Sequence, residues 1–158
     1  MGYFGGIDPG ESGGFGIIDD MGRHVISERW TDTGAFKAAI DRLAIPSSSI
    51  LLVCLEKVHS MPGQGVSSTF KFGRNFGTWI GIIGTLGIPL EEITPARWMK
   101  AVLDSGDRSV SHRMRFASQR WPDAGLKFKP GCKTSVDSGR ADGLCLAEYA
   151  RSRIACVL

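Results

Sequence analysis

Four acidic residues stand where a small sheet protein could hold a divalent cation: Asp8, Glu56, Asp137 and Asp142. Asp8 ends a short apolar strand before a Pro-Gly turn, and Glu56 ends a continuous apolar run. A carboxylate at the end of a core strand is costly to remove from water unless a cation meets it, and its oxygens suit Mg²⁺. Two such ions can stabilise the attacking and the leaving oxygen of a phosphoryl displacement, which then needs no nucleophilic side chain. Consistently, the sequence contains no GxSxG, HExxH or P-loop lysine motif.

Asp8 also allows a purely local interpretation. An aspartate before Pro-Gly often accepts a hydrogen bond from its own backbone in an Asx turn. The three further acids favour the metal-site interpretation, because they come from separate parts of the chain. The sequence therefore predicts a metal ligand at Asp8 and leaves the Asx turn open.

The elements that must position these acids follow from apolar periodicity and turn residues. Residues 4–26 contain three apolar runs separated by Gly-containing turns, which is typical of three antiparallel strands. The run at 50–56 is apolar on both faces, as expected of a central parallel strand, and a fifth strand is predicted at 88–94. Helical spacing predicts helices at 35–43, 66–86, 95–103, 107–121 and 142–154.

This order of elements predicts how the acids meet. If the first and fourth strands are neighbours, Asp8 and Glu56 lie at the same end of the sheet. The pattern indicates an α/β, RNase H-like fold, with a mixed five-stranded sheet (three antiparallel strands, then two parallel) flanked by helices. At 158 residues and 17.1 kDa, the chain fits a single RNase H-like domain over residues 1–158.

Charge is distributed unevenly along the chain, although the formal net charge is only +3. The first 56 residues hold eight Asp or Glu and four Lys or Arg, so the positive charge lies in the later part. Such asymmetry favours a face that binds a polyanion, while a mixed solvated surface gives the same count.

The sequence also predicts the compartment. The most apolar window, residues 79–90, is too short to cross a bilayer, and no signal peptide is recognised. We therefore expect no membrane partner and a cytoplasmic location, in a host cytoplasm if the chain is phage-encoded. The cysteines form no CxxC pair and are expected to be reduced thiols rather than zinc ligands; they are Cys54, Cys132, Cys145 and Cys156.

The predicted helix at 66–86 carries aromatic residues and a glycine at every third or fourth position. Glycines at this spacing let another backbone approach one helix face closely. Two explanations are open: packing of this helix on the sheet alone, or packing on the sheet together with a dimer partner.

Four segments, taken in order, resemble the RuvC-type Holliday junction resolvases in their phage version. They are GIDPGESGGFGII, LEKV with Glu56, GVSSTFKFGRNFGTWIGIIGTLGIP and DSGRADGLCLAEYAR, and together they span nearly the whole chain. The resemblance implies a homodimeric, Mg²⁺-dependent endonuclease that nicks four-way DNA junctions symmetrically, with Mn²⁺ as a substitute ion. It implies that Asp8, Glu56, Asp137 and Asp142 are the metal ligands.

The resemblance also implies a DNA-binding surface. An aromatic residue near the start of the long helix would wedge at the junction centre, and Phe70 or Phe72 matches that position; burial in the core is the alternative. Basic residues would hold backbone phosphates, and the candidates are Lys71, Arg74, Arg108, Arg113, Lys127, Lys129 and Arg140.

One position departs from the family pattern. A histidine is expected beside the last acidic pair, and this chain has Ser138. His59 could substitute in part; if the histidine is needed, the enzyme is slow or prefers Mn²⁺. The alternatives are a non-cleaving junction binder and a broader branched-DNA or flap endonuclease. A sugar-kinase-like ATPase, suggested by the Asp8 loop alone, would need a second domain.

Overall fold

A single mixed sheet forms the centre of the computed structural model, which describes residues 1–57, 65–103, 106–127 and 137–155. Its strand order is β3-β2-β1-β4-β5. β1 pairs antiparallel with β2 and parallel with β4, while β3 and β5 form the edges. The predicted topology is therefore confirmed. The strands are β1 (Tyr3–Asp8), β2 (Gly14–Asp19), β3 (His24–Arg29), β4 (Ile50–Glu56) and β5 (Leu90–Ile93).

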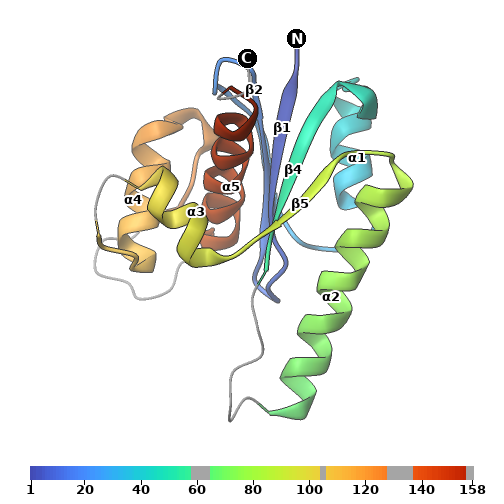
Figure 1. Cartoon of the computed structure of the whole chain (residues 1–158), viewed down its shortest axis with the longest axis vertical. Coiled ribbons are helices and arrows are strands. Elements are labelled where there is room, and N and C mark those ends of the chain that lie inside the picture. The colour runs from blue at the N-terminus through green and yellow to red at the C-terminus, as the bar shows by residue number, and fades with distance from the viewer. Residues whose placement is uncertain (58–64, 104–105, 128–136, 156–158) are drawn as a thin grey trace.

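Helices cover both faces of the sheet (Figure 1). α1 and α2 lie on one face, and α3, α4 and α5 lie on the other. None of the helices in the described ranges is long and apolar enough to cross a membrane. The helices are α1 (Ala35–Arg42), α2 (Val66–Thr85), α3 (Pro95–Val102), α4 (Val110–Arg120) and α5 (Ser138–Ala155), with short 3-10 turns η1 (Ser47–Ser49) and η2 (Pro122–Ala124).

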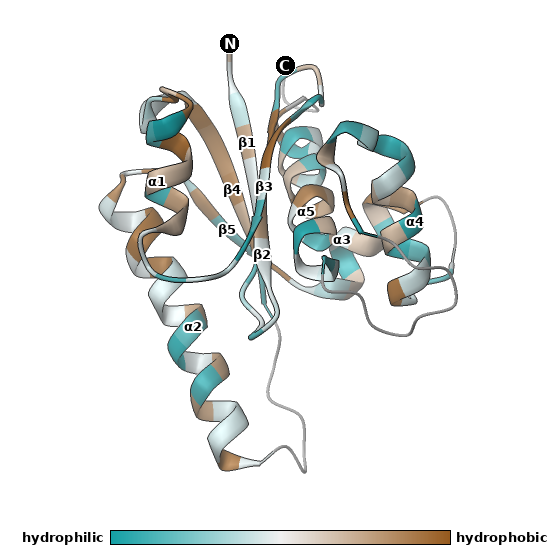
Figure 2. Cartoon of the chain, turned by 180° about the vertical axis from the view of Figure 1, so that it is seen from behind, coloured by the Kyte–Doolittle hydropathy of each residue, from teal (hydrophilic) through white to brown (hydrophobic). Residues whose placement is uncertain are grey.

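Each face of the sheet has its own apolar core. Ile7, Phe15 and Trp79 belong to the core under α1 and α2. Trp98 and Trp121 belong to the core around α5. β4 contributes to both cores, and Figure 2 shows it hydrophobic over most of its length, which confirms a central strand buried on both faces.

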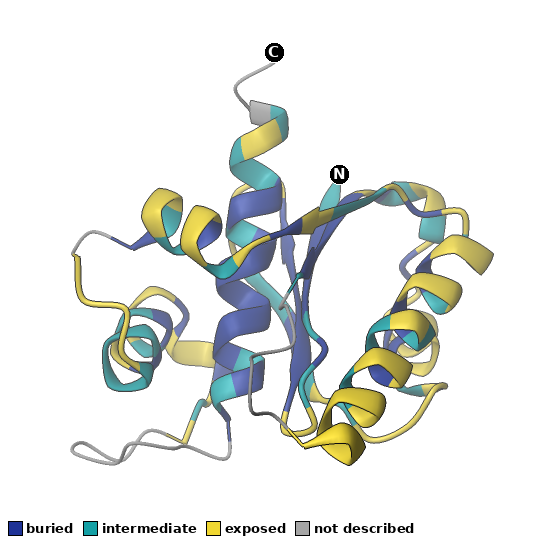
Figure 3. Cartoon of the chain, turned by 60° about the horizontal axis from the view of Figure 1, so that its bottom comes forward, coloured by how far each residue is buried: buried dark blue, intermediate teal, exposed yellow. Residues whose placement is uncertain are grey.

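Glycines let α5 lie unusually close to the sheet. A Cβ on Gly6 of β1 would lie 2.2 Å from the carbonyl oxygen of Gly143 on α5. Gly13 and Gly139 are close enough to form a backbone bridge. Figure 3 accordingly shows α5 buried over most of its length, whereas α2 is largely exposed. The thiols of Cys54 and Cys145 are buried, and the other two cysteines lie outside the described residues.

Some predicted bounds were wrong. α5 begins at Ser138 rather than at residue 142, because Ser138-Gly139 continues the helix instead of forming a turn. Asp142 therefore lies in the second turn of the helix and Asp137 directly before it. α4 begins later than predicted, after Ser109, whose hydroxyl accepts a hydrogen bond from the backbone N–H of His112.

Candidate metal centre at the end of the sheet

Asp8 and Glu56 meet at one end of the sheet, as predicted. Ile7 of β1 pairs with Leu55 of β4 in parallel register, so the next residues, Asp8 and Glu56, end neighbouring strands. Ile7 and Leu55 belong to the core under α1 and α2. Because successive side chains of a strand point to opposite faces, Asp8 and Glu56 point to the face covered by α5.

Backbone and indole N–H groups fix these two carboxylates. The backbone N–H of Gly10 donates to Asp8 Oδ1 at 2.9 Å, so the Asx turn is present. Trp98 Nε1 on α3 donates to Glu56 Oε1 at 2.8 Å. The Asx turn uses one carboxylate oxygen, and it is therefore compatible with a metal-binding role for Asp8. Sequence reasoning missed Trp98, because an aromatic residue at helical spacing is typical of a core position.

Asp142 joins them from α5. Its carboxylate is buried and accepts a two-point hydrogen bond from Arg113 on α4, from Nε at 2.7 Å and from Nη2 at 3.1 Å. Burial raises the pKa of Asp142 although Arg113 opposes the shift. Arg113 was predicted to contact DNA, but the structure turns its side chain inward, where only 14% of it is exposed.

The three carboxylates influence each other's protonation. Removal from solvent, followed by the charge of Asp142, raises the pKa of Asp8 to about 6. Removal from solvent, followed by the charge of Asp8, raises the pKa of Glu56 to about 7. The positive charge of Arg113 lowers both values in part. Like charges gathered away from water are typical of a site that a cation completes.

Asp137 lies in a different cluster. Its Oδ2 accepts a hydrogen bond from the backbone N–H of Lys127 at 2.7 Å and lies 3.4 Å from Arg140 Nη1. Arg140 also donates to the backbone oxygens of Ser27 and Ala124, so it ties the start of α5 to β3 and η2. The structure therefore gives Asp137 and Arg140 contacts that hold the fold, and their predicted roles toward metal and DNA stay predictions.

The donor set fits a hard divalent cation. Asp8, Glu56 and Asp142 supply only carboxylate oxygens, which Mg²⁺ and Mn²⁺ prefer. Within the described residues, no three His, Cys, Asp or Glu side chains yet converge closely enough to hold an ion. Both oxygens of Asp142 face the guanidinium of Arg113 instead.

The start of α2 lies near this centre. α2 projects past the ends of β1 and β4 (Figure 1), and Lys71 lies 3.6 Å from Glu11 in the turn that follows Asp8. Phe70 is 71% exposed, so core burial is wrong for this residue. Phe72 is half-buried and stacks on Phe76, with 6.1 Å between ring centroids.

The other predicted phosphate contacts divide by exposure. Arg74, Arg108 and Lys127 are exposed, as a phosphate-binding residue must be. Lys129 and His59 lie outside the described residues. Within the described residues, the exposed basic candidates therefore lie near the start of α2, just before α4 and shortly after η2.

Two solved structures resemble the whole chain. One is "T. thermophilus RuvC in complex with Holliday junction substrate", with a TM-score of 0.62 and 18% sequence identity, covering 98% of this chain and 96% of that chain. The other is "Thermus thermophilus RuvC structure", with a TM-score of 0.63 and 19% identity, covering 97% and 96%. No family model and no curated protein matches the sequence. The similarity shows that this chain has the RuvC-type, RNase H-like fold.

Proposed function

We propose that this chain, which has the RuvC fold, is a divalent-metal-dependent endodeoxyribonuclease that resolves four-way DNA junctions by paired nicks. The supporting observation is the group of Asp8, Glu56 and Asp142. Three elements distant in sequence place these carboxylates at the same end of the sheet, where Glu56 and Asp142 are buried and Asp8 is partly buried. A structural role does not explain why a fold would gather like charges there, because each costs free energy to bury.

Each carboxylate has a defined support in the proposed reaction. The Gly10 N–H orients Asp8 and the Trp98 indole orients Glu56, so both carboxylates are already positioned before a cation binds. Mg²⁺ or Mn²⁺ held there would supply an activated water and neutralise charge that develops on the phosphate. Asp137 acts in this proposal mainly through the start of α5, and direct ligation by Asp137 stays a prediction.

Junction DNA would reach the centre along α2. Phe70, Lys71 and Arg74 lie in the first turns of α2, on the part that projects past the strand ends. An exposed aromatic ring beside basic side chains can stack on a base while the cations hold phosphates. We therefore assign the junction wedge to Phe70 rather than to the half-buried Phe72.

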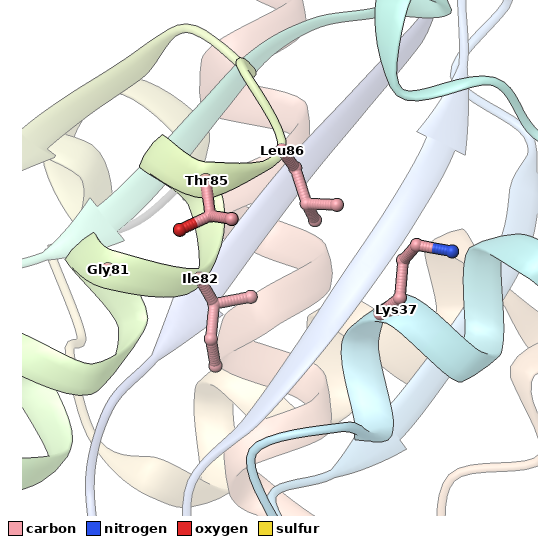
Figure 4. Close-up of a pocket in the computed structure, with 5 residues that line it drawn as sticks. All are labelled: Lys37, Gly81, Ile82, Thr85 and Leu86. Atoms are coloured by element: carbon pink, nitrogen blue, oxygen red, sulfur yellow. The ribbon is translucent and has the colours of Figure 1, made fainter.

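A homodimer would use the outer face of α2. A Cβ added at any of four α2 glycines would meet no atom within 4 Å, so packing on the sheet does not explain them; they are Gly73, Gly77, Gly81 and Gly84. Gly81 also borders an apolar groove of about 380 Å³ between α1 and α2, whose lining includes Ile82 and Leu86 (Figure 4). A two-fold dimer would match the two-fold symmetry of the junction.

Nicking of a labelled immobile four-way junction, compared with a linear duplex of the same sequence, tests the proposal. We expect paired nicks in Mg²⁺ or Mn²⁺ that are absent in EDTA and in Asp8→Asn. Tight junction binding without cleavage in either metal would overturn the nuclease proposal. The protein would then be a non-cleaving junction binder, an alternative suggested by Ser138 at the position where a histidine is expected. Equal cleavage of flaps and four-way junctions would indicate the broader branched-DNA specificity.

A further inference from the structure

Arg113 is the cation that the described centre already holds. Its guanidinium reaches from α4 across to α5, where Nε and Nη2 donate to the two oxygens of Asp142 at 2.7 and 3.1 Å. The third nitrogen, Nη1, donates to the backbone oxygen of Arg108 at 2.7 Å. All three nitrogens therefore have partners, which fixes the side chain in this position.

This contact conflicts with metal binding at Asp142. A two-point arginine–carboxylate pair is among the stronger hydrogen-bonded pairs, and it uses both oxygens of the carboxylate. A divalent cation would need at least one of those oxygens. Two positive charges also repel when they share a carboxylate in a site withdrawn from solvent. Arg113 and a bound cation therefore cannot both keep their full contacts with Asp142.

We propose that Arg113 competes with the divalent cation for Asp142. In the metal-free protein Arg113 holds Asp142, and it releases at least one of the carboxylate oxygens when a cation binds. Arg113 is thus a positioning residue that limits how tightly the centre binds its metal. This inference rests on the proposed function only in taking Asp8, Glu56 and Asp142 as the metal centre, and it does not depend on DNA cleavage.

The opposite role makes the opposite prediction. If Arg113 only oriented Asp142 for the metal, its loss would weaken metal binding by about ten- to a hundredfold, as the loss of supporting contacts around metal ligands generally does. Competition predicts tighter binding when Arg113 is removed. The sign of the change therefore separates the two roles.

Mn²⁺ binding to the full chain without DNA, measured by calorimetric titration, tests this inference. We expect Arg113→Gln to bind Mn²⁺ at least about tenfold more tightly, because even one hydrogen bond to a charged group is worth about that factor. Arg115→Gln removes the same charge from an exposed position on the same helix and is the matched control; it should bind Mn²⁺ within about twofold of the unchanged protein. Asp142→Asn should lose most of the binding.

Melting temperatures with and without Mn²⁺ test the inference even if a variant folds poorly. Removal of Arg113 leaves the buried Asp142 without its counter-ion, so Arg113→Gln should have a lower melting temperature in EDTA and a larger gain on adding Mn²⁺. If Arg113→Gln does not fold, Arg113→Lys keeps the charge but makes fewer contacts, and it should bind Mn²⁺ more tightly than the unchanged protein. Unchanged or weaker Mn²⁺ binding in the folded variant, or binding that survives Asp142→Asn, would overturn the inference. If Arg113→Gln binds Mn²⁺ more tightly but the unchanged protein does not cut junctions, the nuclease proposal fails and this inference stands.

Discussion

Substitution of Gly6 by alanine should move Asp8 on β1 away from Asp142 on α5. A Cβ at Gly6 would lie 2.2 Å from Gly143 O, 2.3 Å from Ala147 N and 2.5 Å from Leu146 Cβ, all on α5. Ordinary contacts lie near 3.5 Å, so α5 would have to move from β1 by about 1 Å. Asp8 is two residues along β1 and Asp142 is next to Gly143, so this movement acts directly on their separation.

Two opposing effects determine how far Gly6→Ala changes the free energy of unfolding. Overpacking costs about 1–3 kcal/mol and sometimes more, and contact with helix backbone places this site at the upper end. Replacement of glycine in a strand interior returns about 0.5–1 kcal/mol. We therefore expect Gly6→Ala to lower the free energy of unfolding by about 2 kcal/mol, which corresponds to about 4–8 °C in melting temperature for a chain of this size. Mn²⁺ binding should weaken as well.

Urea denaturation and Mn²⁺ titration of Gly6→Ala measure both effects. Gly106→Ala is the control, because a Cβ there meets nothing within 4 Å, and it should change stability by less than about 0.5 kcal/mol. A Gly6→Ala protein that is as stable as the parent, or more stable, would refute the close approach of α5 to β1. Reduced stability with unchanged Mn²⁺ affinity would refute the link between this contact and the centre.

Four further results are expected. Phe70→Ala should leave the free energy of unfolding within about 0.5 kcal/mol, because the ring is exposed, while junction affinity falls in a gel-shift assay. Asp137→Ala should lower stability by about 1–2 kcal/mol in urea denaturation yet keep Mn²⁺ binding; complete loss of binding would make Asp137 a ligand. Gly77→Glu should shift the mass measured by light scattering from dimer to monomer, and a monomeric parent protein would contradict the proposed interface. In EDTA, the raised pKa values of Asp8 and Glu56, about 6 and 7, predict stability that is full below about pH 4 and is lost as the pH rises from there through these values, by on the order of 3 kcal/mol for each carboxylate; Asp8→Asn should flatten this dependence.

The sequence predicts the sheet and the pairing of Asp8 with Glu56 because these depend on local signals. Apolar runs and turns define the strands, and a strand that is apolar on both faces lies in the centre of a sheet. Asp8 and Glu56 each end one of two neighbouring parallel strands, so they lie at the same end of the sheet. The bounds of the last helix were missed for a tertiary reason, since Gly139 is needed for its contact with Gly13 and not for a turn.

Arg113 could not be assigned from the sequence. On an amphipathic helix its position beside the buried Met114 allows either an inward or an outward side chain. The packing of α4 against α5 decides between them, and that contact joins residues 29 positions apart. The hydrogen bond from Trp98 to Glu56 joins residues 42 positions apart and is likewise invisible to local patterns.

Close packing and repulsion act on the same few residues. The charges of Asp8 and Asp142 raise the free energy of holding β1 and α5 together, and Arg113 offsets this only in part. A Cβ added at Gly6, two residues before Asp8, would lie 2.2 Å from the carbonyl oxygen of Gly143, directly after Asp142. Close packing therefore lies beside the carboxylates that repel, so these glycines hold Asp8 and Asp142 at a separation that their charges alone would not maintain. For this reason we expect substitutions of these glycines to affect metal binding as well as stability, whereas the open glycines of α2 should affect neither within a single chain.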